Sequence, residues 1–171
     1  MAPPEERFIE RVCQFCDFFK GVLEDAKNDN IDTPASPFIM EVVKNFVKKE
    51  DPNAAITTFI LRSYKSWDNA VARDKNYFRT DALSCFAGIP AASVESFNGL
   101  FDLRKSNGEL LISEEIQNNL WDFFDSLIKT SIVYIHQQRK PDPTTKKYTQ
   151  AFFPDISVKN EVARWRITSM E

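Results

Sequence analysis

The sequence has few of the residues on which tight turns and metal sites depend, because it contains only four glycines and one histidine. Four glycines are few for a fold built on tight hairpins or for loops that cradle phosphate groups. One histidine excludes histidine-rich metal sites and catalysis by several histidines. Walker, Rossmann and kinase glycine patterns are missing, as is the G-x-S-x-G motif of serine hydrolases. We therefore expect a protein that is not an enzyme.

Cysteine and long apolar runs are also scarce. The chain has three cysteines, an odd number, and no apolar segment typical of a secretory signal follows Met1. No apolar run approaches the roughly 20 residues that a transmembrane helix needs. We therefore expect an intracellular, cytoplasmic protein in a reducing compartment, with no membrane anchor.

Neither sign of charge dominates, since 25 acidic and 22 basic residues leave a net charge of −3. This balance gives no general attraction to nucleic acid or to an anionic membrane. The charges are unevenly placed: residues 1–33 hold eight acidic and four basic residues, and residues 139–171 hold seven basic and four acidic residues. Opposite ends of this kind can attract each other within one molecule or between two.

Phenylalanine, by contrast, is abundant, with fifteen in the chain and aromatic residues at 13% of the total. This content excludes a disordered or low-complexity protein. A length of 171 residues fits one domain. Such a chain buries enough surface to fold without a disulfide or a metal.

Apolar residues recur at spacings of three and four over most of the chain, which is typical of helices packed on one face. Ser36-Pro37, Asp51-Pro52 and Ser113 are typical helix starts. The pattern predicts helices at about 5–28, 37–49, 52–72, 74–87, 91–101 and 114–138. We expect their apolar residues to form the core. In the second helix these residues are Phe38, Val42, Val43, Phe46 and Val47.

The periodicity stops near residue 138, where Pro141, Pro143 and Pro154 interrupt the chain. The sequence therefore predicts an all-α fold: a single irregular bundle of about six helices over 1–138, followed by an extended arm over 139–171. We expect the arm to pack on the bundle or on a neighbouring subunit.

The arm is predicted to end in a short helix that begins near Ser157 and carries Val158, Val162 and Trp165. Its other aromatic residues are not explained by helical periodicity. Together with two phenylalanines beside the predicted apolar faces, they are our candidates for binding a partner. These candidates are Phe18, Phe123, Tyr148, Phe152, Phe153 and Trp165.

Cys13 and Cys16 form a C-x-x-C pair, but the pair lies inside a predicted helix with no strand before it, unlike a redox motif. A zinc site would need four ligands, and only Cys85 and His136 remain, without a second closely spaced pair. We interpret the cysteines as buried thiols, and His136 as a surface or helix-capping residue. The sequence predicts no metal and no cofactor.

The segment 101–115 resembles an EF-hand loop in its position between two helices. With Gly108 at the sixth position of such a loop, Leu103 and Lys105 would occupy the first and third positions. Neither side chain binds calcium. We therefore expect a corner between two helices.

These observations favour a non-enzymatic protein–protein interaction or assembly protein, and a homodimer formed through the arm would fit them. One alternative is a nucleic-acid-binding protein that uses the arm's aromatic and basic residues. The basic residues concerned are Arg139, Lys140, Lys146, Lys147, Arg164 and Arg166. Another alternative is a small helical ligand carrier or enzyme with an aromatic pocket.

Two stretches resemble uncharacterised all-helical proteins encoded by large DNA viruses of eukaryotes. The first is Phe59-Ile60-Leu61-Arg62-Ser63-Tyr64-Lys65-Ser66-Trp67-Asp68 with Asp74-Lys75-Asn76-Tyr77-Phe78, Ala82 and Phe86. The second is Leu120-Trp121-Asp122-Phe123-Phe124-Asp125-Ser126-Leu127-Ile128-Lys129 with Tyr134-Ile135-His136. The resemblance covers about 60–136 and depends on aromatic and aspartate positions. It implies a viral interaction protein in the host cytoplasm or nucleus, and it brings no catalytic residues.

Overall fold

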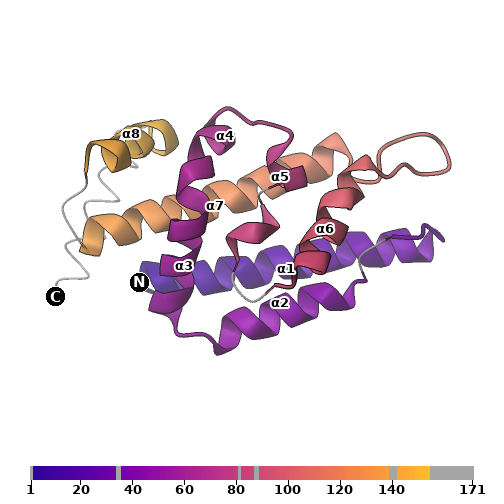
Figure 1. The fold of residues 1–171 in the computed structure, drawn as a ribbon, viewed down its shortest axis with the longest axis horizontal. Coiled ribbons are helices and arrows are strands. Elements are labelled where there is room, and N and C mark those ends of the chain that lie inside the picture. The colour runs from indigo at the N-terminus through magenta and orange to yellow at the C-terminus, as the bar shows by residue number, and fades with distance from the viewer. Residues whose placement is uncertain (1, 34–35, 81, 87–88, 139–141, 155–171) are drawn as a thin grey trace.

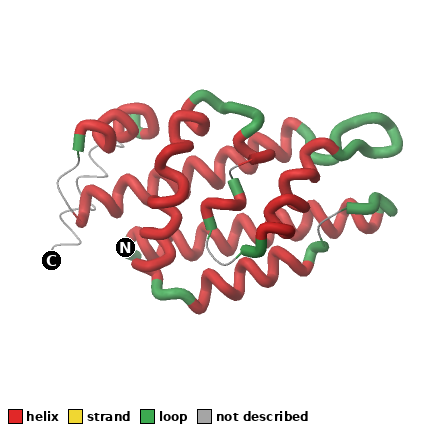
Figure 2. The backbone as a smooth tube through the Cα atoms, in the orientation of Figure 1, coloured by secondary structure: helices red, strands yellow, loops and turns green. Residues whose placement is uncertain are grey.

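A computed structural model describes residues 2–33, 36–80, 82–86, 89–138 and 142–154. The predicted all-α fold is confirmed: Figure 2 shows helices joined by loops, and these described ranges contain no strand. Six of the described helices have nine residues or more. The whole set packs around one aromatic core.

Two helices of 25 residues form the centre of the bundle: α1 (Pro4–Asn28) and α7 (Glu114–Gln138), which pack against each other (Figure 1). Both were predicted. A proline begins α1, and Ser113 caps α7, since its Oγ accepts a hydrogen bond from the backbone N–H of Ile116 at 3.3 Å.

Helices α2 (Phe38–Lys49) and α3 (Pro52–Ser63) follow, and both pack on α1. Asp51 caps α3 as predicted, because its Oδ2 accepts from the N–H of Ala54 at 3.1 Å. The predicted helix over 52–72 is divided: a 3-10 turn over Tyr64–Ser66 separates α3 from α4 (Trp67–Val71).

The single helix predicted over 74–87 is wrong. The chain instead forms the one-turn helix α5 (Tyr77–Thr80) and a 3-10 turn over Leu83–Cys85. Six residues in this stretch are buried, namely Tyr77, Phe78, Ala82, Leu83, Cys85 and Phe86. On one continuous helix they would cover more than half of the circumference, which is wider than the face that a helix can turn to a core. Breaking the helix lets the side chains enter the core from different directions.

Helix α6 (Ala91–Gly99) continues into a 3-10 turn over Leu100–Asp102, close to the predicted helix at 91–101. The predicted corner follows: Arg104 and Leu110 form an isolated antiparallel bridge. Gly108 between them has a φ of 87°, a left-handed conformation that favours glycine.

Within the predicted arm, the expectation of extended chain is wrong over Pro143–Phe152, which form helix α8. Asp142 caps this helix by accepting a hydrogen bond from the N–H of Thr145 at 2.7 Å. Helix α8 packs on α7 and α4. The remaining part of the predicted arm, including the terminal helix near Ser157, lies outside the described residues.

Candidate interaction surface on helix α2

The inner face of α2 is held on α1 by apolar contacts and two ion pairs. Met40, Val43 and Val47 are buried on this face. Beside them, the Nζ of Lys44 lies 2.7 Å from the Oδ1 of Asp17, and the Nζ of Lys20 lies 3.1 Å from the Oε1 of Glu41. These contacts orient α2, and they leave its opposite face toward solvent.

That outer face is apolar. Phe38, Val42 and Phe46 are 70%, 41% and 42% exposed, and they are three of the five large hydrophobic residues that are exposed in the described chain. Their spacing of four residues places them one above another on successive turns. We call these three residues the α2 stripe.

Two further features define the surroundings of the stripe. Lys48 and Lys49 are exposed in the last turn of α2, where cations complement the helix dipole. The N-terminal end is held by Ser36, whose Oγ accepts from the N–H of Phe38 at 3.2 Å. The stripe thus lies on a helix whose first N–H is hydrogen-bonded and which is fixed to the bundle.

Sequence reasoning assigned Phe38, Val42 and Phe46 to the core, and the structure contradicts this. The signal that could have revealed the stripe was present: α2 carries apolar residues on two faces, and one helix cannot bury both against α1. Val43 and Val47 of the same prediction are buried as expected.

The first two residues predicted to bind a partner come together but are half-buried. The rings of Phe18 on α1 and Phe123 on α7 lie 5.4 Å apart between centroids and pack against the core. The guanidinium of Arg11 lies 4.4 Å from the centre of the Phe123 ring and covers its outer side. This pair therefore offers a partner much less apolar surface than the α2 stripe does.

Three others, Tyr148, Phe152 and Phe153, are buried within the same chain. The ring of Tyr148 packs at 5.6 Å from Tyr64 and 5.3 Å from Trp67, and these contacts seat α8 on the bundle. To reach a partner, these three side chains would have to leave the bundle. Trp165 lies outside the described residues.

Other contacts also hold α8 in place. Lys147 pairs with Asp68 on α4 at 3.1 Å, and burial, with a contribution from Asp68, raises the pKa of Tyr148 to about 12. The Nε2 of His136 lies 3.0 Å from the Oγ1 of Thr149. Since that hydroxyl donates its hydrogen to the backbone oxygen of Thr145, it accepts from His136. His136 thus links α7 to α8.

Of the basic residues in the nucleic-acid alternative, the structure describes only Lys146 and Lys147. Both are exposed on α8, and Lys147 is occupied by its ion pair with Asp68. Arg139, Lys140, Arg164 and Arg166 lie outside the described residues. The described chain therefore contains no assembled patch of these six residues.

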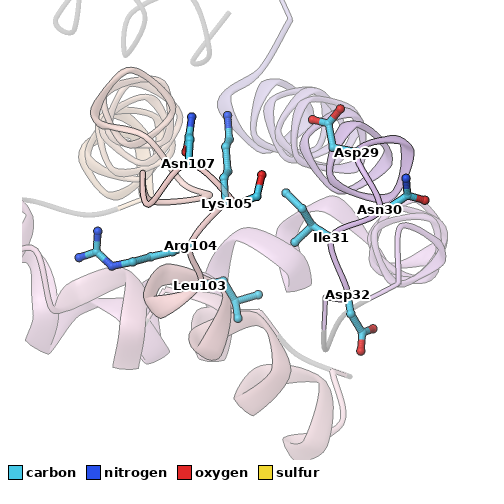
Figure 3. Close-up of a pocket in the computed structure, with 9 residues that line it drawn as sticks. Asp29, Asn30, Ile31, Asp32, Leu103, Arg104, Lys105 and Asn107 are labelled. Carbon is cyan, nitrogen blue, oxygen red and sulfur yellow. The ribbon is translucent and has the colours of Figure 1, made fainter.

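An open cleft of about 550 Å³ lies between the loop after α1 and the corner at 103–107. Figure 3 shows Asp29 on one wall and Lys105 on the other, with Ile31 between them. The Arg104 side chain points away, and its guanidinium donates to the backbone oxygen of Gly108 at 2.7 Å. Opposite charges on facing walls favour neither an anion nor a cation.

A second cleft, of about 590 Å³, lies beside Trp121. The guanidinium of Arg73 stacks 5.0 Å from the Trp121 ring and donates to both carboxylate oxygens of Asp125. These contacts orient the Arg73 side chain and attach the loop after α4 to α7.

The cysteines are free thiols, with Cys16 and Cys85 buried and Cys13 half-buried. Burial raises the pKa of Cys13, and it raises that of Cys16 to about 12, so both remain protonated at neutral pH. Within the described ranges, no three His, Cys, Asp or Glu side chains lie close enough together to bind a metal ion.

None of the described helices combines the length and apolar composition required to cross a membrane. Comparisons of the chain with models of protein families, with curated proteins and with solved structures find no match.

Proposed function

We propose that this chain is a non-enzymatic protein–protein interaction or assembly protein that binds through the α2 stripe. The observation that carries the proposal is the exposure of Phe38, Val42 and Phe46 on one face of a helix whose other face is packed on α1. Apolar side chains at this spacing are the anchors by which helices dock on partners. The resemblance of residues 60–136 to viral proteins adds a viral origin to the proposal.

Covering the stripe would release a substantial free energy. Full burial of one valine or phenylalanine side chain is worth about 1.5–3 kcal/mol relative to exposure. Phe38 alone is 70% exposed, so the chain by itself obtains little of this energy. Val42 and Phe46 are 41% and 42% exposed, so a partner that covers all three side chains would obtain the part of this energy that belongs to their remaining exposed surface.

The support beneath the stripe reduces the cost of binding. Helix α2 is packed on α1 by Met40, Val43 and Val47, and the pairs of Lys44 with Asp17 and Lys20 with Glu41 oppose its rotation. A surface that is already ordered loses less conformational entropy when a partner binds.

The test is site-specific crosslinking in the cells that make the protein naturally. The photoreactive amino acid p-benzoylphenylalanine replaces Phe46 in one sample and Leu61 in another, since Leu61 is 76% exposed on α3 and matches Phe46 in character. We expect a covalent protein adduct from position 46 and little or none from position 61. The absence of an adduct at position 46, or equal adducts at both positions, would contradict the proposal.

A further inference from the structure

We infer that the α2 stripe is covered by residues 157–167 of a second copy of this chain, and that each copy gives this segment to the other. The inference rests on the proposed function and identifies the partner. It depends on three observations: the exposed stripe, the apolar pattern of the segment, and the place where the described chain ends.

The pattern of the segment matches that of the stripe. Val158, Val162 and Trp165 recur at spacings of four and three, so a helix that begins near Ser157 would place them on one face. Eleven helical residues span about 16 Å at 1.5 Å per residue, and the eight steps from Phe38 to Phe46 span about 12 Å. One such helix is therefore long enough to cover the stripe.

The order of the helices favours a segment that comes from a second copy. Helix α8 packs on α7, α7 on α1, and α1 on α2, and Figure 1 shows α8 and α2 on opposite sides of the α1–α7 pair. Axes of packed helices lie about 8–10 Å apart, so α7 and α2, on opposite sides of α1, are separated by up to about 16–20 Å.

The connection from Pro154 to Ser157 contains only residues 155 and 156. Its three steps between Cα atoms span at most about 11 Å. This is too short for a helix that begins at Ser157 to start on the α2 stripe of its own chain. The α2 stripe of a second copy is not subject to this limit on distance, because the second molecule can bind with its stripe next to the end of α8.

Reciprocal exchange also supplies the area that one stripe lacks. A stable interface buries about 800 Å² on each partner, and three partly exposed side chains provide only part of that. When each copy both gives a segment and receives one, the dimer contains two such contacts, related by a two-fold axis.

The first experiment measures the molar mass of the full chain by sedimentation and light scattering over a range of concentrations. We expect a dimer of twice the 19.8 kDa chain mass, which dissociates on dilution. Val42→Asp in the stripe and Val162→Asp in the segment are each expected to be monomers. Leu61→Asp places the same charge at an exposed position on α3 and is expected to remain a dimer. Circular dichroism verifies that every variant is folded.

The second experiment mixes the two monomeric variants. Val42→Asp keeps an intact segment and Val162→Asp keeps an intact stripe, so an equal mixture regains one of the two contacts. We expect dimers in the mixture at a concentration at which each variant alone is monomeric. A Val162→Asp variant that stays dimeric would overturn the exchange in favour of direct contact between two α2 helices. Failure of the mixture to dimerise, or a full chain that is monomeric at every concentration, would also overturn it.

The crosslinking sample with the photoreactive group at position 46 separates this inference from the proposed function. An adduct with a second copy supports both. An adduct with a different protein, from a chain that is monomeric, overturns the exchange and leaves the proposed function standing. No adduct at all overturns the proposed function itself.

Discussion

The Nζ of Lys44 on α2 lies 2.7 Å from the Oδ1 of Asp17 on α1, and this ion pair helps to decide which face of α2 meets the solvent. Lys20 and Glu41 form a second pair between the same helices at 3.1 Å. Each hydrogen bond raises the pKa of its lysine, so both lysines remain charged at neutral pH. A rotation of α2 that buried the stripe would separate both pairs.

Reversing the charge at position 44 tests this role. In Lys44→Glu, the new carboxylate faces Asp17, and the repulsion should loosen α2 from α1. We expect backbone amides of α2 to exchange hydrogen faster than in the unaltered chain, and the difference to shrink at about 1 M salt because the charges are screened. Lys49→Glu, at an exposed position outside the α1–α2 contact, is the control. Equal exchange in the two variants would show that the pair does not hold α2.

A second prediction contrasts a core ring with a ring of the α2 stripe. Phe124 is fully buried, with ring centroids of Phe15 and Phe78 both at 5.7 Å. Phe124→Ala should therefore lower the free energy of unfolding by about 3–5 kcal/mol through the lost contacts and the cavity. Phe38→Ala should change it by less than about 0.5 kcal/mol in the monomer. Urea denaturation of dilute protein measures both, and a large loss in Phe38→Ala would mean that this ring is buried.

A third prediction concerns the start of α8. Asp142→Ala removes the carboxylate that accepts from the N–H of Thr145, and the loss of such a cap costs about 0.5–2 kcal/mol. We expect faster hydrogen exchange in α8 than in the control Thr144→Ala, whose exposed side chain does not cap the helix. If exchange in α8 is the same in both variants, the cap does not stabilise the helix.

A fourth prediction follows from the buried thiol of Cys16. Its pKa is raised from 9.0 to about 12, mainly by burial, so above pH 9 the unfolded chain loses this proton before the folded chain does. The stabilisation is complete below the lower pKa and is lost as the pH rises toward the higher one. Between these values the free energy of unfolding should fall by up to about 1.4 kcal/mol per pH unit more steeply than in Cys16→Ala. Urea denaturation at rising pH measures both slopes, and equal slopes would contradict the assignment.

Much of the helical layout was predictable because caps and prolines act on neighbouring residues. Asp51-Pro52 and Ser113 mark the starts of α3 and α7, and both caps are present. Asp142-Pro143 is the same signal as Asp51-Pro52, and it begins α8 in the same way. Reading Pro143 as a helix breaker rather than as a first helical residue led us to predict extended chain where α8 forms.

The candidate site was predictable only in part. The sequence shows that α2 is a helix with apolar residues, but these fall into two sets, each at helical spacing. One set is Met40, Val43 and Val47, and the other is the α2 stripe. The sequence of α2 alone does not indicate which of the two sets is buried.

The amino-acid sequence by itself determined the helical class, most helix starts and the supply of aromatic residues for the core. Only the tertiary structure decided which apolar face of α2 is buried, and where the chain bends between Tyr77 and Phe86. The physical reason is that a helix start depends on contacts within a few residues. Burial depends on surfaces from distant parts of the chain, and only one face of α2 can pack on α1.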